Sequence, residues 1–139
     1  CIRDRSMEDT QTSPSDRGAI LRGLQRAETT EAGAWTVLRT TAGTLEGRVA
    51  SVLNTLGADA VVVTRARDGV TRLTVRAPRS SVQSGLHMGS IMEGIAETLG
   101  GDGGGHDGAA GWTGDAHPVA AETAFIDAVA RTVRKEDDR

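Results

Sequence analysis

Residues 100–114 read GGDGGGHDGAAGWTG, which places eight glycines in fifteen positions. Glycine adopts positive φ freely and lets a ligand approach the main chain, and consecutive amides can form a concavity that suits an anion. A helical turn beginning near His106 would add its own free N–H groups to such a site. A flexible linker is the alternative for a glycine-rich stretch. The apolar run Ala109-Ala110-Gly111-Trp112 fits a packed element better, so we expect a structured glycine-rich loop.

Familiar motifs do not account for this loop. Gly103, Gly105 and Gly108 match the spacing of a dinucleotide-binding fingerprint, but they follow a predicted helix rather than a strand. A phosphate loop of the Walker type needs a Gly-Lys pair, and the only lysine is Lys135. The three histidines have no i, i+4 pair and no paired cysteines beside them, so a shared zinc site is not expected.

Helices flank the loop on both sides. The apolar stripe of the preceding helix ends at Leu99, just before Gly100-Gly101. The following helix is predicted over about 118–135, with an apolar stripe through Ile126 and Val133. Residues 78–87 are predicted to be a loop.

A hairpin is predicted further upstream. Residues 58–65 form a β-branched run typical of a buried strand, and residues 70–76 form a second strand. Asp68-Gly69 between them is a strong signal for a tight turn, so the two strands should pair antiparallel.

Strands and helices continue to alternate toward the N-terminus. We expect a helix through 49–56 that ends at Gly57, a strand over 35–40, and a helix over about 17–32 capped by Asp16. The predicted class is therefore α/β or α+β, with a mixed sheet flanked by helices. Residues 1–16 are expected to be a linker or tail, and 17–139 a single domain.

The net charge and the amino-acid composition exclude some kinds of binding surface. The 139 residues carry a net charge of −3, so a broad basic surface for nucleic acid is not expected and any anion site must be local. Fifteen of the sixteen basic residues are arginine, which binds phosphate through a planar fork. With one Phe, two Trp and no Tyr, a base-stacking platform is not expected either. A single cysteine and the lack of a long apolar run favour a cytoplasmic protein that does not enter a membrane.

Three segments together resemble a known family: Gly103-Gly104-Gly105-His106, Gly108-Ala109-Ala110-Gly111, and Val75-Arg76 at the end of a strand. Their order, with a helix between the arginine and the glycines, is similar to the C-terminal DHH-associated domain of DHH-family phosphoesterases. Within that family the chain looks most like RecJ-like single-strand exonucleases, and residues 49–57 look like haloarchaeal members. The resemblance covers about 34–135.

The resemblance implies a substrate-binding role. In such enzymes manganese or magnesium ions sit in a separate Asp-His-His domain, and the associated domain binds the phosphate or nucleotide across a cleft. Here His106 would contact a phosphate or base, Gly103 to Gly105 would supply amides, and Arg76 would pair with a phosphate. Asn54 would be a further substrate contact. The implied ligand is single-stranded nucleic acid or a short oligonucleotide.

Other interpretations remain open. The chain contains no Asp-His-His, so the resemblance implies no cofactor in this chain and no hydrolysis by it alone. It could be a subunit that is active only with a separate DHH chain, or a truncated remnant. Because the sequence begins with Cys1 rather than Met, a fragment or an excised module is expected, although Met7 could be an internal start. His106 could instead be a capping or turn residue, Arg76 could form a surface ion pair, and Asn54 could be a polar position of its helix.

Overall fold

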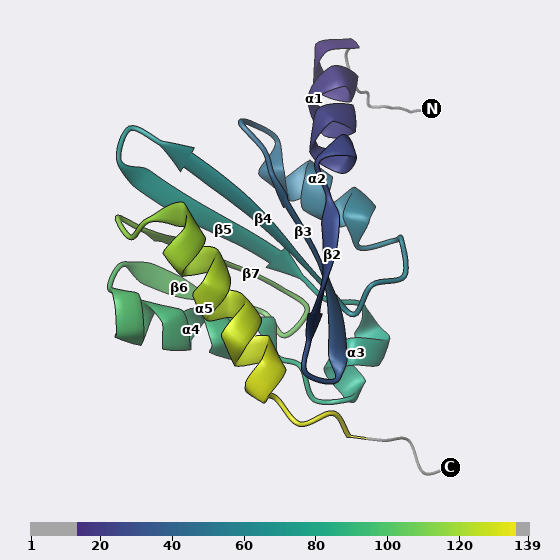
Figure 1. Ribbon diagram of the computed structural model, residues 1–139, viewed down its shortest axis with the longest axis vertical. Coiled ribbons are helices and arrows are strands. Elements are labelled where there is room, and N and C mark those ends of the chain that lie inside the picture. The colour runs from purple at the N-terminus through teal and green to yellow at the C-terminus, as the bar shows by residue number, and fades with distance from the viewer. Residues whose placement is uncertain (1–13, 136–139) are drawn as a thin grey trace, which may run out of the picture.

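The computed structural model describes residues 14–135. A six-stranded mixed sheet with strand order β2-β3-β4-β5-β7-β6 lies between two layers of helices. Figure 1 shows α5 in front of the sheet and α2 behind it. The predicted fold class, a mixed sheet flanked by helices, is confirmed. No helix within the described residues is long and apolar enough to cross a membrane.

The strands are β2 (Glu28–Ala32), β3 (Trp35–Thr41), β4 (Ala60–Arg67), β5 (Val70–Arg76), β6 (Asp102–Gly105) and β7 (Ala109–Gly114). The helices are α1 (Pro14–Gln25), α2 (Glu46–Leu53), α3 (Arg79–Gln83), α4 (Met88–Leu99) and α5 (Pro118–Arg131). The strands at 35–41, 60–67 and 70–76 and the helices α2, α4 and α5 confirm the predicted elements, with ends shifted by a few residues.

Strand pairing combines one parallel step with several antiparallel ones. β3 and β4 pair in parallel through the crossover helix α2, as a β-α-β unit requires. β4 and β5 form the predicted antiparallel hairpin, and both Asp68 and Gly69 in its turn have positive φ. β7 then pairs antiparallel with β5, and β6 lies at the edge, paired with β7.

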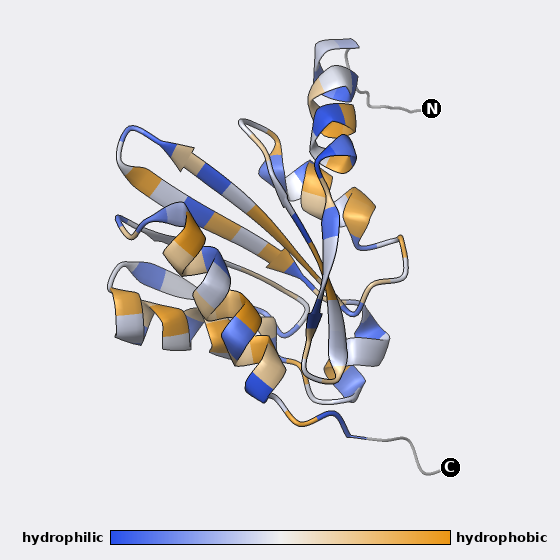
Figure 2. Cartoon of the chain, in the orientation of Figure 1, coloured by the Kyte–Doolittle hydropathy of each residue, from blue (hydrophilic) through white to orange (hydrophobic). Residues whose placement is uncertain are grey.

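Each face of the sheet has its own hydrophobic core. The larger core packs α4 and α5 on one face and includes the fully buried residues Trp35, Trp112 and Phe125. The smaller core packs α1 and α2 on the other face around Val61 and Val63. Figure 2 shows hydrophobic residues concentrated along the central strands and α4. All three aromatic residues are buried, so none is exposed for base stacking.

The predicted helix over 17–32 is wrong in its second half. α1 ends at Gln25, and residues 28–32 form the edge strand β2, which pairs with β3 from Glu28↔Arg39 to Ala32↔Trp35. Gly33, at φ 62°, therefore serves the β2–β3 turn rather than a helix end. Asp16 is not the N-cap, because α1 begins at Pro14 and includes it. Most of the predicted tail, residues 1–13, lies outside the described residues.

Two predicted loops contain regular structure. Within residues 78–87, Arg79–Gln83 form the short helix α3. The glycine-rich segment, expected as a structured loop, forms the strands β6 and β7 with a short turn between them. Glycine has low strand propensity, so pairing with β5 and packing of α4 decide this conformation instead of local preference.

Candidate functional site

The turn between β6 and β7 is held by main-chain hydrogen bonds. The His106 N–H donates to the Ala109 carbonyl at 2.8 Å, and the Ala77 N–H donates to the Gly108 carbonyl at 2.9 Å. The carbonyls of His106 and Asp107 accept from Gly89 and Met88, at 2.9 and 2.8 Å. These bonds anchor the turn to both α4 and the end of β5.

This arrangement corrects the expected source of free amides. No helix begins at His106; the nearest helix N-terminus is that of α4. Its first amides donate to the turn carbonyls, and the Ser90 N–H donates to Nδ1 of His87 at 3.0 Å. The α4 N-terminus is therefore occupied by the protein itself.

Close packing explains several of the glycines. A Cβ on Gly103 would overlap the carbonyl oxygen of Met92, and one on Gly89 would overlap that of Gly105. Gly105 has a φ of 145°, and a Cβ there would meet the Ala110 Cα at 2.6 Å. The main chain of α4 thus rests directly on the β6–β7 hairpin.

Some amides of the glycine run remain directed outward. Because the His106 N–H points toward β7 and N–H groups alternate along an antiparallel ladder, we expect those of Gly103 and Gly105 to point toward the edge of β6 that no other described strand covers. By the same alternation the Gly104 N–H belongs to the β6–β7 ladder. The edge of β6 therefore offers main-chain donors beside His106.

Arg76 ends β5 on the face that carries α2. It is half-buried, and its Nε is buried with no hydrogen-bond partner. Within residues 14–135 its guanidinium makes no ion pair or hydrogen bond. Buried polar atoms without partners are rare and costly, so a guanidinium in this state suits an anionic ligand. The alternative of a surface ion pair for Arg76 is not found among the described residues.

A shallow hollow of about 520 Å³ opens around Arg76. Its other walls are Ile20 from α1 and Gly47, Arg48, Ser51 and Val52 from α2. A Cβ on Gly47 would lie 3.8 Å from an Nη atom of Arg76, so the start of α2 lies in van der Waals reach of the guanidinium. Arg48 pairs with Asp16 at 3.8 Å, which leaves Arg76 as the cation of the hollow that has no partner among residues 14–135.

Sequence reasoning did not identify Arg48 and Ser51. Their only signal was their place on the exposed side of a predicted amphipathic helix, which ordinary surface residues share.

His106 and Arg76 are brought to the same end of the sheet. Ala109 pairs with Arg76 in register and accepts the His106 N–H, so the two residues lie two strands apart. With strands about 4.8 Å apart, their backbones are separated by about 10 Å. His106 is exposed, and the small residue Ala109 lies between them. The pair therefore could contact two groups of one ligand.

Asn54 is not brought to this hollow. Asn54 follows the last residue of α2 as its C-cap, and its N–H donates to the Ala50 carbonyl at 2.9 Å. It does not line the hollow around Arg76. Its Oδ1 is buried with no hydrogen-bond partner within the described residues. A substrate contact for Asn54 stays a prediction.

The acidic residue beside the turn is neutralised locally. Arg79 lies 3.2 Å from Oδ2 of Asp107, and its hydrogen bond, together with its charge, lowers the pKa of the Asp107 carboxyl. The repulsion that Asp107 would exert on a phosphate is thereby reduced.

The remaining histidines have structural roles. The Nδ1 atoms of His87 and His117 accept from the amides of Ser90 and Val119, at 3.0 and 3.1 Å, and so cap α4 and α5. The capping role considered for His106 is thus performed by the other two. Among residues 14–135 no group of three or more His, Cys, Asp or Glu could hold a metal ion. The donor set of these residues does not fit a metal centre.

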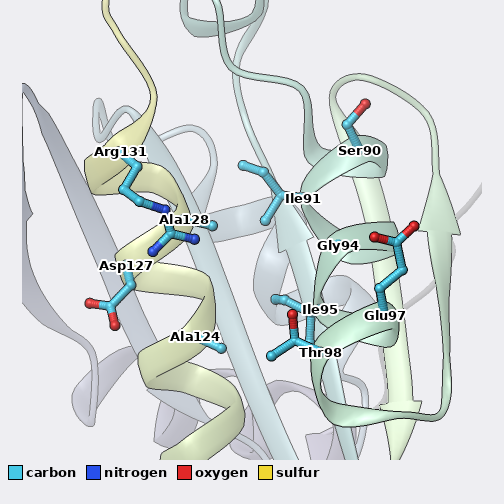
Figure 3. Close-up of a pocket in the computed structure, with 10 residues that line it drawn as sticks. All are labelled: Ser90, Ile91, Gly94, Ile95, Glu97, Thr98, Ala124, Asp127, Ala128 and Arg131. Atoms are coloured by element: carbon cyan, nitrogen blue, oxygen red, sulfur yellow. The ribbon is translucent and has the colours of Figure 1, made fainter.

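A second hollow of about 460 Å³ lies between α4 and α5, on the other face of the sheet. Figure 3 shows Arg131 and Asp127 from α5 on one side of it and Ile91 and Glu97 from α4 on the other. It brings together none of the residues that the sequence analysis singled out.

Known proteins include relatives of this chain in sequence and in fold. Residues 33–135 match the family model of the DHHA1 domain. An uncharacterized protein of Methanocaldococcus jannaschii is 32% identical over 103 residues, covering 73% of this chain and 31% of that protein. The chain thus spans about a third of the length of this relative.

Two solved structures have a similar fold. The C-Ala domain of Aquifex aeolicus alanyl-tRNA synthetase has a TM-score of 0.60 at 14% identity, covering 74% of this chain and 98% of that domain. A DHH-domain structure described as a member of the s1p family of ribosomal proteins has a TM-score of 0.61 at 16% identity, covering 86% of this chain and 31% of that protein. Identities this low establish shared architecture alone. The family match over residues 33–135 goes further: the chain belongs to the DHHA1 domain family.

Proposed function

We propose that this chain is the substrate-binding domain of a DHH-type phosphoesterase of the RecJ-like kind, and that it holds single-stranded nucleic acid or a short oligonucleotide by its phosphates. The observation that carries the proposal is the guanidinium of Arg76, which has a buried Nε and no counter-ion among the described residues. Arginine binds a phosphate through two parallel N–H donors, so a phosphate would supply the missing partner.

The β6–β7 turn supplies the second contact. His106 is exposed, and its backbone and that of Gly105 lie about 10 Å from the backbone of Arg76 by strand spacing, with Gly103 about 7 Å further along β6. An oligonucleotide could therefore place one phosphate at Arg76 and a neighbouring phosphate or base at His106. Hydrolysis would require manganese or magnesium ions in a DHH half, which would face this site from another part of the protein or from a separate chain.

Binding of a fluorescein-labelled single-stranded tetranucleotide, followed by anisotropy, tests the proposal. We expect Arg76→Ala and His106→Ala each to weaken binding by roughly 10- to 150-fold, because a hydrogen bond to a charged group contributes about 1.5–3 kcal/mol. Arg131→Ala, an exposed arginine on α5, is the matched control and should bind like wild type. Equal binding by all four proteins would refute the proposal.

A mixing experiment separates the alternatives. If the chain works in trans, cleavage of the tetranucleotide should appear only when a manganese-loaded DHH domain is added as a separate chain. A remnant should neither bind the tetranucleotide nor restore cleavage.

A further inference from the structure

A group of arginines lies on the β4–β5 hairpin, away from the site just described. Arg65, Arg67 and Arg72, together with Val70, line a hollow of about 150 Å³, which is large enough for a phosphate-sized group. We call these three arginines the hairpin arginine cluster. Val70 is 46% exposed in this hollow.

The hairpin arginine cluster brings like charges together. Arg65 and Arg72 are direct cross-strand partners in the β4–β5 register, an arrangement that destabilises a sheet unless the charges are offset. Glu46, at the start of α2, offsets part of this charge. One of its carboxylate oxygens lies 3.1 Å from Arg65 and 3.3 Å from Arg72.

One carboxylate cannot neutralise three guanidinium groups. Arg67 is exposed, and within residues 14–135 it makes no ion pair or hydrogen bond. Two further acids lie nearby. Asp68 is in the hairpin turn, and Asp102 of β6 pairs with Thr113 of β7, which in turn pairs with Arg72. Among residues 14–135 only the Glu46 carboxylate pairs with the cluster, so three guanidinium groups against one paired carboxylate give a local positive charge in a chain whose net charge is −3.

The cluster shares a face of the sheet with Arg76. Residues 72, 74 and 76 of β5 alternate onto one side, which is also the side of Val61 and Val63 in the smaller core. At about 3.4 Å per residue, Arg72 lies about 14 Å from Arg76 along β5. Val70, the β5 residue that pairs with Arg67, lies about 20 Å from Arg76, so Arg67 is at a similar distance along the sheet. A dinucleotide held at Arg76 could not reach Arg67, whereas a longer extended strand could.

We infer that the hairpin arginine cluster is a second phosphate-binding point for a single strand whose other end is held by Arg76 and His106. The inference rests on the proposed function and names its ligand class: an oligonucleotide of several residues that runs along β5, rather than a dinucleotide. Because all three aromatic residues are buried, the grip on this strand is through phosphates and is independent of base sequence.

The test compares a labelled dinucleotide with a labelled octanucleotide of the same base. Wild type should bind the octanucleotide about tenfold more tightly, because the second contact becomes intramolecular once the first has formed. Arg67→Ala should remove most of that advantage, leave dinucleotide binding unchanged, and lower the salt slope of octanucleotide binding by about 0.7. Arg131→Ala is the charge-matched control, and urea midpoints verify that each variant is folded.

The outcomes separate the two proposals. Equal affinity for both lengths, or equal loss in Arg67→Ala and Arg131→Ala, overturns the inference while leaving Arg76-dependent dinucleotide binding intact. Loss of all dependence on Arg76 overturns the proposed function itself. Competition by poly-glutamate as strong as by unlabelled octanucleotide would identify the cluster as a site for acidic protein segments and would also overturn the inference.

Discussion

The two hairpins of this domain are built by opposite means. β4 and β5 carry β-branched and charged side chains, joined by the tight Asp68-Gly69 turn. β6 and β7 are mostly glycine and alanine, and α4 lies so close that its main chain replaces side chains as the packing surface. The first hairpin is stabilised by contacts of its side chains. The second is stabilised by close packing of main chain against main chain, which the lack of side chains on its glycines allows.

This difference bears on function. Small residues in the second hairpin hold the turn at His106 close to α4 and leave the β6 edge open, whereas the first hairpin presents arginines on its surface. One hairpin offers main-chain donors and an imidazole, and the other offers guanidinium groups. We expect perturbations of the two hairpins to differ accordingly.

The largest effect is expected from Gly103→Ala. Its Cβ would overlap the Met92 carbonyl oxygen, so α4 and β6 must move apart, which we expect to lower the free energy of unfolding by about 3 kcal/mol. Urea unfolding followed by circular dichroism measures the change. In the control Gly104→Ala, a Cβ would lie 3.8 Å from Glu93 Cγ, so its midpoint should stay near wild type. Similar losses in both would contradict the close-packing explanation.

Glu46→Gln should destabilise the first hairpin by about 2 kcal/mol, because Arg65 and Arg72 would then face each other without a carboxylate. Burial alone would raise the pKa of Glu46. Hydrogen bonds from its own amide and from Arg65, with the charges of both arginines, outweigh burial and lower that pKa.

A lowered pKa in the folded state fixes the sign of the pH dependence. The Glu46 contribution is complete above the unfolded pKa, near 4.5, and is lost as pH falls through the lower folded value. Urea unfolding of wild type and Glu46→Gln from pH 7 to pH 3 should therefore show a difference that shrinks below about pH 4.5. A constant difference across this range would argue that lost packing, rather than charge, is responsible.

Gly69→Ala probes the turn of the first hairpin. Gly69 has a φ of 79°, and no atom lies within 4 Å of the position that a Cβ would take, so the cost is conformational and should be about 1 kcal/mol. Gly43→Ala, which has equal space and no positive φ, serves as the comparison in thermal unfolding. If both substitutions shift the melting temperature equally, backbone conformation is not the cause.

The smallest effect is expected at the turn of the second hairpin. The Arg79–Asp107 pair is largely exposed, so Asp107→Asn should leave the urea midpoint unchanged. Removing the negative charge beside His106 should instead strengthen tetranucleotide binding by about twofold at low salt and not at high salt. A shifted urea midpoint would show that the pair stabilises the turn.

Sequence patterns predicted the first hairpin well and the second poorly. A β-branched run and an Asp-Gly turn are local signals, so β4 and β5 could be recognised directly. Glu28–Ala32 has no alternating apolar pattern and becomes a strand because β3 offers it an edge. The glycines of β6 have no strand propensity and take their conformation from β7 and α4.

Local sequence patterns were enough to predict the mixed α and β class, the family resemblance carried by Gly103-Gly104-Gly105-His106, and Arg76 as a candidate binding residue. Three features became visible in the folded domain: Arg76 lacks a counter-ion among the described residues, the first α4 amides already donate to the protein's own groups, and arginines on β4 and β5 share one face of the sheet with Arg76. The physical reason is that partners, burial and strand register depend on contacts between segments far apart in the chain, whereas motifs and periodicity record only local preference.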